Sequence, residues 1–197
     1  MNADSYRRHV DQFLKTPDNV RTTILSAIDA WERIRTTRIA NPVDVQSIVD
    51  AVLSSAGLCW GPGCELLGNL ANDHDAAKDA MRTIMKTGSA TQRWQLLSGS
   101  MKPCTDDAFR KEILVAGLAD RGAKVRIRAA EMSDIVRMVE MIPALETRLG
   151  IEKDAKVRHE LERAIALLRD GHFAFPRDGE PDKWNLTIRL HNGWGRR

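Results

Sequence analysis

The chain has 197 residues, of which 43% are hydrophobic, 29% are charged and 5% are aromatic, and its net charge is +3. This length suits one folded unit, and the balance of apolar and charged residues is typical of a globular protein. The small basic excess is well below that of a dedicated DNA-binding domain.

The sequence shows no sign of a membrane or secretory segment. No run approaches the roughly 20 apolar residues that a membrane-spanning helix needs. Met1 to Leu14 carries several charged residues where a signal peptide has an apolar stretch. We therefore expect a cytoplasmic protein that does not associate with a membrane.

The first predicted elements are an atypical helix pair, Ser5 to Leu14 and Val20 to Arg35. A further helix is expected from Pro42 to Ser55, because Asn41 is a good N-cap and proline is favoured in the first turn. Its apolar residues recur at helical spacing and should be buried: Val45, Ile48, Val49 and Val52.

The run Cys59-Trp-Gly-Pro-Gly-Cys64 interrupts this pattern. Glycine and proline favour a turn, so we expect a loop here, flanked by two buried cysteines, and then a shorter helix from about Cys64 to Ala71. The spacing of these cysteines is a weak signal for zinc or redox chemistry, since no second Cys or His pair lies nearby. The three cysteines, which include Cys104, show no disulfide framework.

The rest of the chain is dominated by an internal repeat. Ala123-Lys-Val-Arg126 recurs as Ala155-Lys-Val-Arg158, and the degenerate copy Ala90-Thr-Gln-Arg93 precedes both at nearly the same spacing. Each copy follows a turn and opens an amphipathic helix. Another helix precedes each copy, and these expected helices are Asp73 to Thr87, Thr105 to Ala119, and Met138 to Leu149.

Two local features refine these helices. Thr105, followed by two aspartates, is the expected N-cap of the second of them. Pro143 falls inside the third, where it predicts a kink.

This pattern resembles HEAT repeats, in which the second helix of each pair opens with an Asp and then a Val-Arg pair. Asp154-Ala-Lys-Val157-Arg158 fits well, Asp120 to Arg126 fits with a two-residue insertion, and Asp18-Asn-Val20-Arg21 is a further copy. The resemblance implies an all-α fold, an α-solenoid of about five antiparallel helix pairs over residues 1–171. Residues 172–197 then form a C-terminal tail.

The tail is expected to pack on the last helices or to contact a partner. The alternation from Trp184 to Leu190 is typical of a short strand.

The aligned arginines have two interpretations. Arg93, Arg126 and Arg158 share one repeat position, and we expect them to form a structural ladder with acidic residues such as Asp120 or Asp154. Other aligned residues of the second helices face the concave side in HEAT-like stacks and are the candidate partner-binding residues: Trp94, Lys124, Arg128, Glu131, Lys156, Glu160 and Arg163. Their mixed charge suits a protein better than nucleic acid.

No nucleophile, phosphate-binding or metal motif stands out, so we expect no enzyme, cofactor or metal. The leading hypothesis is a non-enzymatic protein-binding scaffold or inhibitor, a class that includes bacterial toxin-immunity proteins. The alternative is a nucleic-acid-binding protein resembling the HEAT-like alkylpurine DNA glycosylases, and a bilin-lyase-like chaperone is a third. The residues available for a nucleic-acid groove are Trp31, Arg33, Arg35, Arg38, Arg93, Trp94, Lys124, Arg126 and Arg128.

Overall fold

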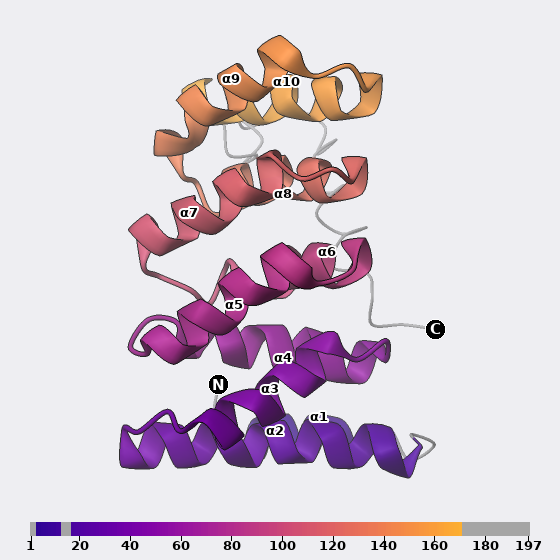
Figure 1. Cartoon of the computed structure of the whole chain (residues 1–197), viewed down its shortest axis with the longest axis vertical. Helices are drawn as coiled ribbons and strands as arrows, with labels where there is room; N and C mark the ends of the chain where they lie inside the picture. The colour runs from indigo at the N-terminus through magenta and orange to yellow at the C-terminus, as the bar shows by residue number, and fades with distance from the viewer. Residues whose placement is uncertain (1–2, 13–16, 171–197) are drawn as a thin grey trace, which may run out of the picture.

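A computed structural model describes residues 3–12 and 17–170, and this part of the chain is all helical. It is an α-solenoid of five helix pairs stacked along the long axis of the molecule (Figure 1). The predicted fold class is therefore confirmed. The helices are α1 (Ala3–Asp11), α2 (Asp18–Thr37), α3 (Pro42–Leu53), α4 (Gly57–Leu70), α5 (Asp75–Thr87), α6 (Ala90–Ser100), α7 (Asp107–Leu118), α8 (Ala123–Ile135), η1 (Val139–Met141), α9 (Ile142–Ile151) and α10 (Ala155–Asp170).

The stack has two unequal layers. The second helices α2, α4, α6, α8 and α10 pack closely, each against the next, whereas the first helices α3, α5, α7 and α9 contact one another more sparsely. In a curved stack the layer with closer spacing lies on the concave side. We call the solvent-facing side of α4, α6, α8 and α10 the inner face.

The repeated tetrapeptide marks the start of the second helices. α6, α8 and α10 begin at Ala90, Ala123 and Ala155, the first residue of each copy. In the degenerate copy, Gln92 replaces the apolar residue and has a different task. Its side chain accepts a hydrogen bond from the backbone N–H of Ser89, while the Ser89 hydroxyl accepts one from the N–H of Gln92, which completes a capping box.

Two predicted helix boundaries need correction. The N-cap of α7 is Asp106, whose carboxylate accepts from the N–H of Phe109, while Thr105 instead hydrogen-bonds to the Asn72 side chain. Pro143 lies in the first turn of α9, after the short 3-10 helix η1. No kink is required there, because the first turn leaves its N–H groups unpaired in any case.

The expected loop at Cys59 to Cys64 was wrong, since the whole run lies within α4. Close helix packing explains one of the glycines of this run, Gly63. A Cβ on Gly63 would lie 2.9 Å from the backbone nitrogen of Val52 on α3. On the neighbouring helix α6, a Cβ on Gly99 would lie 2.5 Å from the Cβ of Cys64. Tertiary contacts have overridden the local turn preference.

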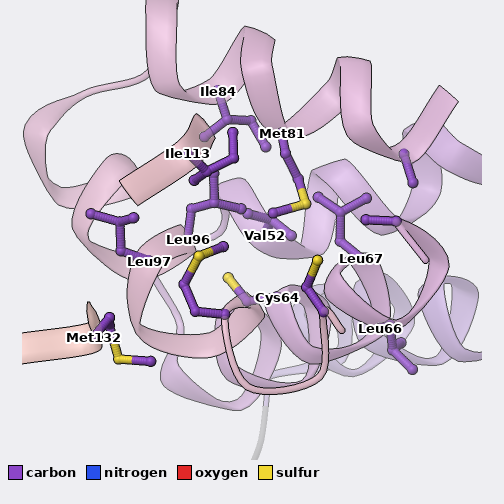
Figure 2. Packing of buried hydrophobic residues seen from close by; sticks show 14 of the residues in the cluster. Val52, Cys64, Leu66, Leu67, Met81, Ile84, Leu96, Leu97, Ile113 and Met132 are labelled. Carbon is purple, nitrogen blue, oxygen red and sulfur yellow. The ribbon is translucent and has the colours of Figure 1, made fainter. Parts of the chain in front are cut away.

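One hydrophobic core runs between the two layers. Figure 2 shows side chains from successive helices meeting in it, and the labelled contributors to this region are Val52, Cys64, Leu66, Leu67, Met81, Ile84, Leu96, Leu97, Ile113 and Met132. Each pair thus buries its apolar faces against its neighbours, which makes the stack cooperative. The predicted tail, including the run from Trp184 to Leu190, lies outside the described residues.

Candidate functional site

Three large side chains form a row across successive helices of the inner face. Trp60 on α4 meets Trp94 on α6 edge to face, with ring centroids 5.9 Å apart. The guanidinium of Arg128 on α8 lies 5.7 Å from the centroid of the Trp94 ring. Its Nε also donates to the Ser98 hydroxyl at 2.8 Å. We call Trp60, Trp94 and Arg128 the aromatic row.

Beyond the aromatic row, arginine–carboxylate ion pairs continue the inner face over α8 and α10. Arg128 pairs with Glu131 on its own helix at 2.9 Å. On α10, Arg163 pairs with Glu160 and also reaches Asp134 of α8 at 2.8 Å. The inner face therefore presents alternating charges rather than a track of one sign.

Asp134 is the least expected member of this group, because it is only 6% exposed. Burial raises its pKa to about 6; the Arg163 cation opposes this rise, and the Glu160 and Glu131 carboxylates add to it. Asp134 thus has a costly negative charge at neutral pH, held in place mainly by Arg163.

Lys124 and Lys156 lie one turn before Arg128 and Glu160 on the same helices, and both are exposed. Neither side-chain ammonium makes a hydrogen bond or an ion pair within the described residues. Of the predicted contact residues, the structure thus joins Trp94, Arg128 and Glu131 in one group and Glu160 and Arg163 in a second. The two lysines stand apart as free cations.

Two of the arginines at the shared repeat position, Arg93 and Arg126, lie in the interior, whereas the Arg158 side chain is 44% exposed. Arg93 pairs with Asp120 through Nε at 2.5 Å and Nη2 at 3.0 Å. Arg126 pairs with Glu152, and not with Asp154. The arginine of the last pair, Arg158, donates instead to backbone carbonyl oxygens of Leu149 and Glu152. The ion pairs of Arg93 and Arg126 join the starts of α6 and α8 to the turn of the next pair, whereas the contacts of Arg158 stay within its own pair.

Most of the other residues considered for a nucleic-acid groove are engaged elsewhere. Trp31 is buried against Tyr6, and Arg35 stacks on its ring at 5.0 Å. Arg33 pairs with Asp44 of α3. Since Arg93 and Arg126 are also buried in ion pairs, these side chains do not combine into one basic groove.

A pocket of about 970 Å³ opens beside the aromatic row. Trp60 lines it, and its walls come from α1, α4, α6 and the turn after α6. We call it the α1–α6 pocket, and its lining residues are Ser5, Tyr6, Arg8, Gln12, Trp60, Gly61, Pro62, Glu65, Ser98, Gly99, Lys102 and Pro103.

Sequence reasoning missed Trp60 and Asp134 as members of the inner face. Trp60 lies near the start of α4, as Trp94 lies near the start of α6, and this correspondence was the available signal. It was hidden because the surrounding glycines and proline suggested a loop. For Asp134 no sequence signal exists, since its burial arises from the packing of α10 on α8.

All three cysteines are buried free thiols, and burial raises the pKa of each of them. Within residues 3–12 and 17–170, no group of three His, Cys, Asp or Glu side chains gathers as a metal site. None of the described helices is both long and apolar enough to cross a bilayer. No protein-family profile, curated protein sequence or solved structure matches the chain.

Proposed function

We propose that this chain is a non-enzymatic scaffold or inhibitor that binds another protein along the inner face of a HEAT-like stack. The observation that carries the proposal is the aromatic row, which continues into alternating ion pairs on α8 and α10. Tryptophan and arginine are among the residues that most often dominate the energy of protein interfaces. Here they lie side by side on one face, near free lysines.

The charge pattern favours a protein over nucleic acid. A phosphate backbone requires many unpaired cations, because its affinity comes from neutralised phosphates. On the inner face the arginines are already paired with Glu131, Glu160 and Asp134. A protein with charges of both signs can instead align with such a surface and gain specificity from it.

Immunity proteins that block a toxin are one kind of inhibitor within this proposal. A toxin encoded beside this gene would be the first partner to test. The direct experiment is formation of a complex between the purified chain and that toxin, measured as a stoichiometric peak in size-exclusion chromatography.

The general test is capture of a protein from extracts of the native host by the immobilised full chain. The double variant Lys124→Glu/Lys156→Glu should weaken capture by at least about tenfold, because it reverses two charges of the inner face that have no side-chain partner within the described residues. Lys86→Glu/Lys111→Glu is the matched control, since these exposed lysines lie on the first helices α5 and α7 and have no side-chain partner in the described part of the chain. Equal loss in both variants would place the contact elsewhere.

The nucleic-acid alternative has its own outcome. If the partner is a protein, we expect no salt-sensitive binding of a labelled DNA duplex. Salt-sensitive binding is an affinity that falls steeply between about 50 and about 200 mM salt. Tight, salt-sensitive binding that is lost in Lys124→Glu/Lys156→Glu and retained in Lys86→Glu/Lys111→Glu would replace the protein partner with nucleic acid.

A further inference from the structure

The lining of the α1–α6 pocket includes two cations that have no side-chain partner in the described part of the chain. Arg8 projects from α1, and Lys102 lies in the turn that follows α6. Both side chains are exposed, and neither makes a hydrogen bond or an ion pair within the described residues. The neighbouring Arg7 differs, because it is occupied by Asp29 and Glu32. The charges of Arg8 and Lys102 therefore remain available to a ligand.

The lining of the pocket includes a glycine at a position where a side chain would fit. Gly61 lies within α4, and a Cβ added to it would meet no atom within 4 Å. The other pocket glycine, Gly99, has a packing reason, since its Cβ would collide with Cys64. A glycine within a helix lowers stability, so Gly61 has a cost that the fold itself does not require. A bare backbone lets a ligand approach closely between Trp60 and Pro62.

A buried hydroxyl adds a third polar feature. Tyr6 lines the pocket, is only 4% exposed, and its hydroxyl lies beside the Glu65 carboxylate without a well-aligned hydrogen bond. Burial and the nearby Glu65 carboxylate raise the pKa of this hydroxyl, so it stays protonated as a donor. Glu65 is the single acidic side chain in the lining. Since the lining also includes Arg8 and Lys102, its described charged side chains have a net positive charge.

We infer that the α1–α6 pocket receives a short acidic segment of the protein partner, with carboxylates at Arg8 and Lys102 and an apolar side chain against Trp60. The inference rests on the proposed function and names the chemistry of one part of the partner. The volume of about 970 Å³ is large enough for several residues of an extended peptide. Because Trp60 belongs to the aromatic row, such a segment would continue directly onto the inner face.

The test uses the full chain and three fluorescein-labelled peptides of equal length. The first alternates glutamate and glycine around one phenylalanine, the second has glutamine in place of glutamate, and the third has lysine. Fluorescence anisotropy at low salt should give an affinity about tenfold higher for the glutamate peptide than for the glutamine peptide. Binding of the lysine peptide should be weaker still.

Gly61→Leu separates the pocket from general attraction to a basic protein, because it adds a bulky side chain to the pocket lining without changing any charge. It should weaken binding of the glutamate peptide by about tenfold or more. Gly150→Leu is the matched control: Gly150 is also helical, a Cβ there also meets nothing within 4 Å, and it lies on α9. Its affinity should equal that of the unmodified chain, and circular dichroism should show both variants folded.

Four results would overturn the inference: no binding of the glutamate peptide, equal binding of the glutamine peptide, full binding by Gly61→Leu, or displacement of the glutamate peptide by oligothymidylate at equal concentration. The last result would assign the pocket to nucleic acid. Capture of the native partner decides the wider proposal separately. If Lys124→Glu/Lys156→Glu loses the partner while the peptide results fail, the inner-face proposal stands and the pocket inference does not.

Discussion

The guanidinium of Arg126 and the carboxylate of Glu152 form a two-pronged ion pair between the fourth and fifth helix pairs, with distances of 2.7 Å from Nε to Oε2 and 3.0 Å from Nη2 to Oε1. The two side chains are only 9% and 3% exposed. Arg93 and Asp120 repeat the arrangement one pair earlier. Arg93 and Arg126 therefore link adjacent pairs, and their place in the interior makes these two arginines a poor contact surface.

Glu152→Gln should lower the free energy of unfolding by about 2 to 3 kcal/mol at neutral pH, because it leaves Arg126 buried without a counter-charge. Burial alone would raise the pKa of Glu152, but hydrogen bonds from Arg126, the Asp154 backbone N–H and Arg148 lower it from 4.5 to about 2. The ionised form is thus favoured in the fold. Its stabilising effect is complete above about pH 4.5 and is lost as the pH falls toward 2.

Urea unfolding of Glu152→Gln and the unmodified chain over a range of pH values measures this effect. The difference between the two proteins should be largest near neutral pH and should shrink below about pH 4.5. A difference that stays constant with pH would show that the ion pair contributes no charge-dependent stability.

Asp134→Asn should raise the free energy of unfolding, whereas Glu152→Gln lowers it. The pKa of Asp134 is raised from 3.8 to about 6, so the fold favours the protonated form and ionisation destabilises the native state. Stability is lost as the pH rises from 3.8 through 6, and the variant removes this loss. We expect it to be about 2 kcal/mol more stable than the unmodified chain at neutral pH, since one pKa unit corresponds to about 1.4 kcal/mol.

The same unfolding measurement checks this prediction. The advantage of Asp134→Asn should disappear below about pH 4, where Asp134 itself is protonated. Arg163 keeps Glu160 as a partner in the variant. A variant that is less stable than the unmodified chain at neutral pH would mean that the Arg163 to Asp134 contact outweighs the cost of burial.

Buried and exposed ion pairs between helix pairs should differ in their effect on stability. Arg82 on α5 and Glu112 on α7 form a two-pronged pair at 2.7 and 2.8 Å, but their side chains are 43% and 47% exposed. Asp120→Asn should therefore lower the free energy of unfolding by about 2 to 3 kcal/mol, and Glu112→Gln by less than about 1 kcal/mol.

Salt provides a second readout for this comparison. The small effect of Glu112→Gln should fall further when ionic strength is raised, since exposed charges are screened. The effect of Asp120→Asn should change little, because its partner Arg93 is 3% exposed. Equal effects and equal salt dependence would contradict the assignment of the buried pairs as the structural ladder.

The internal repeat allowed much of the fold to be predicted, because a short match located three helix starts at once. α6, α8 and α10 begin at the expected residues, and α3 begins at Pro42 with Asn41 as its cap. In the predicted apolar stripe of α3, Val45, Ile48 and Val52 are buried, and Val49 is half-buried.

The errors occurred where long-range contacts decide the local structure. In the run Cys59 to Cys64, Gly63 lets α3 approach α4 closely, and Gly99 on α6 lets that helix approach Cys64; no local rule contains that information. Missing this helix also hid Trp60 from the candidate site. The charged residues of α8 and α10 could be placed on one face by their spacing, but their partners could not, because these depend on which rotamers the packed helices allow.

The glycines of α4 provide a direct test of this explanation. Gly61→Ala should raise the free energy of unfolding by about 0.5 to 1 kcal/mol, since a Cβ there meets nothing within 4 Å and alanine is the better helix former. Gly68→Ala should lower it by about 2 kcal/mol, because its Cβ would collide with the carbonyl oxygen of Ser100 and force α4 away from the end of α6. Thermal and urea unfolding measure both changes. The change in the free energy of unfolding should have opposite signs in the two variants if packing requires glycine at position 68 but not at position 61. Destabilisation by Gly61→Ala would show that the pocket lining is shaped by contacts within the fold, and would remove the reason for assigning that glycine to a ligand.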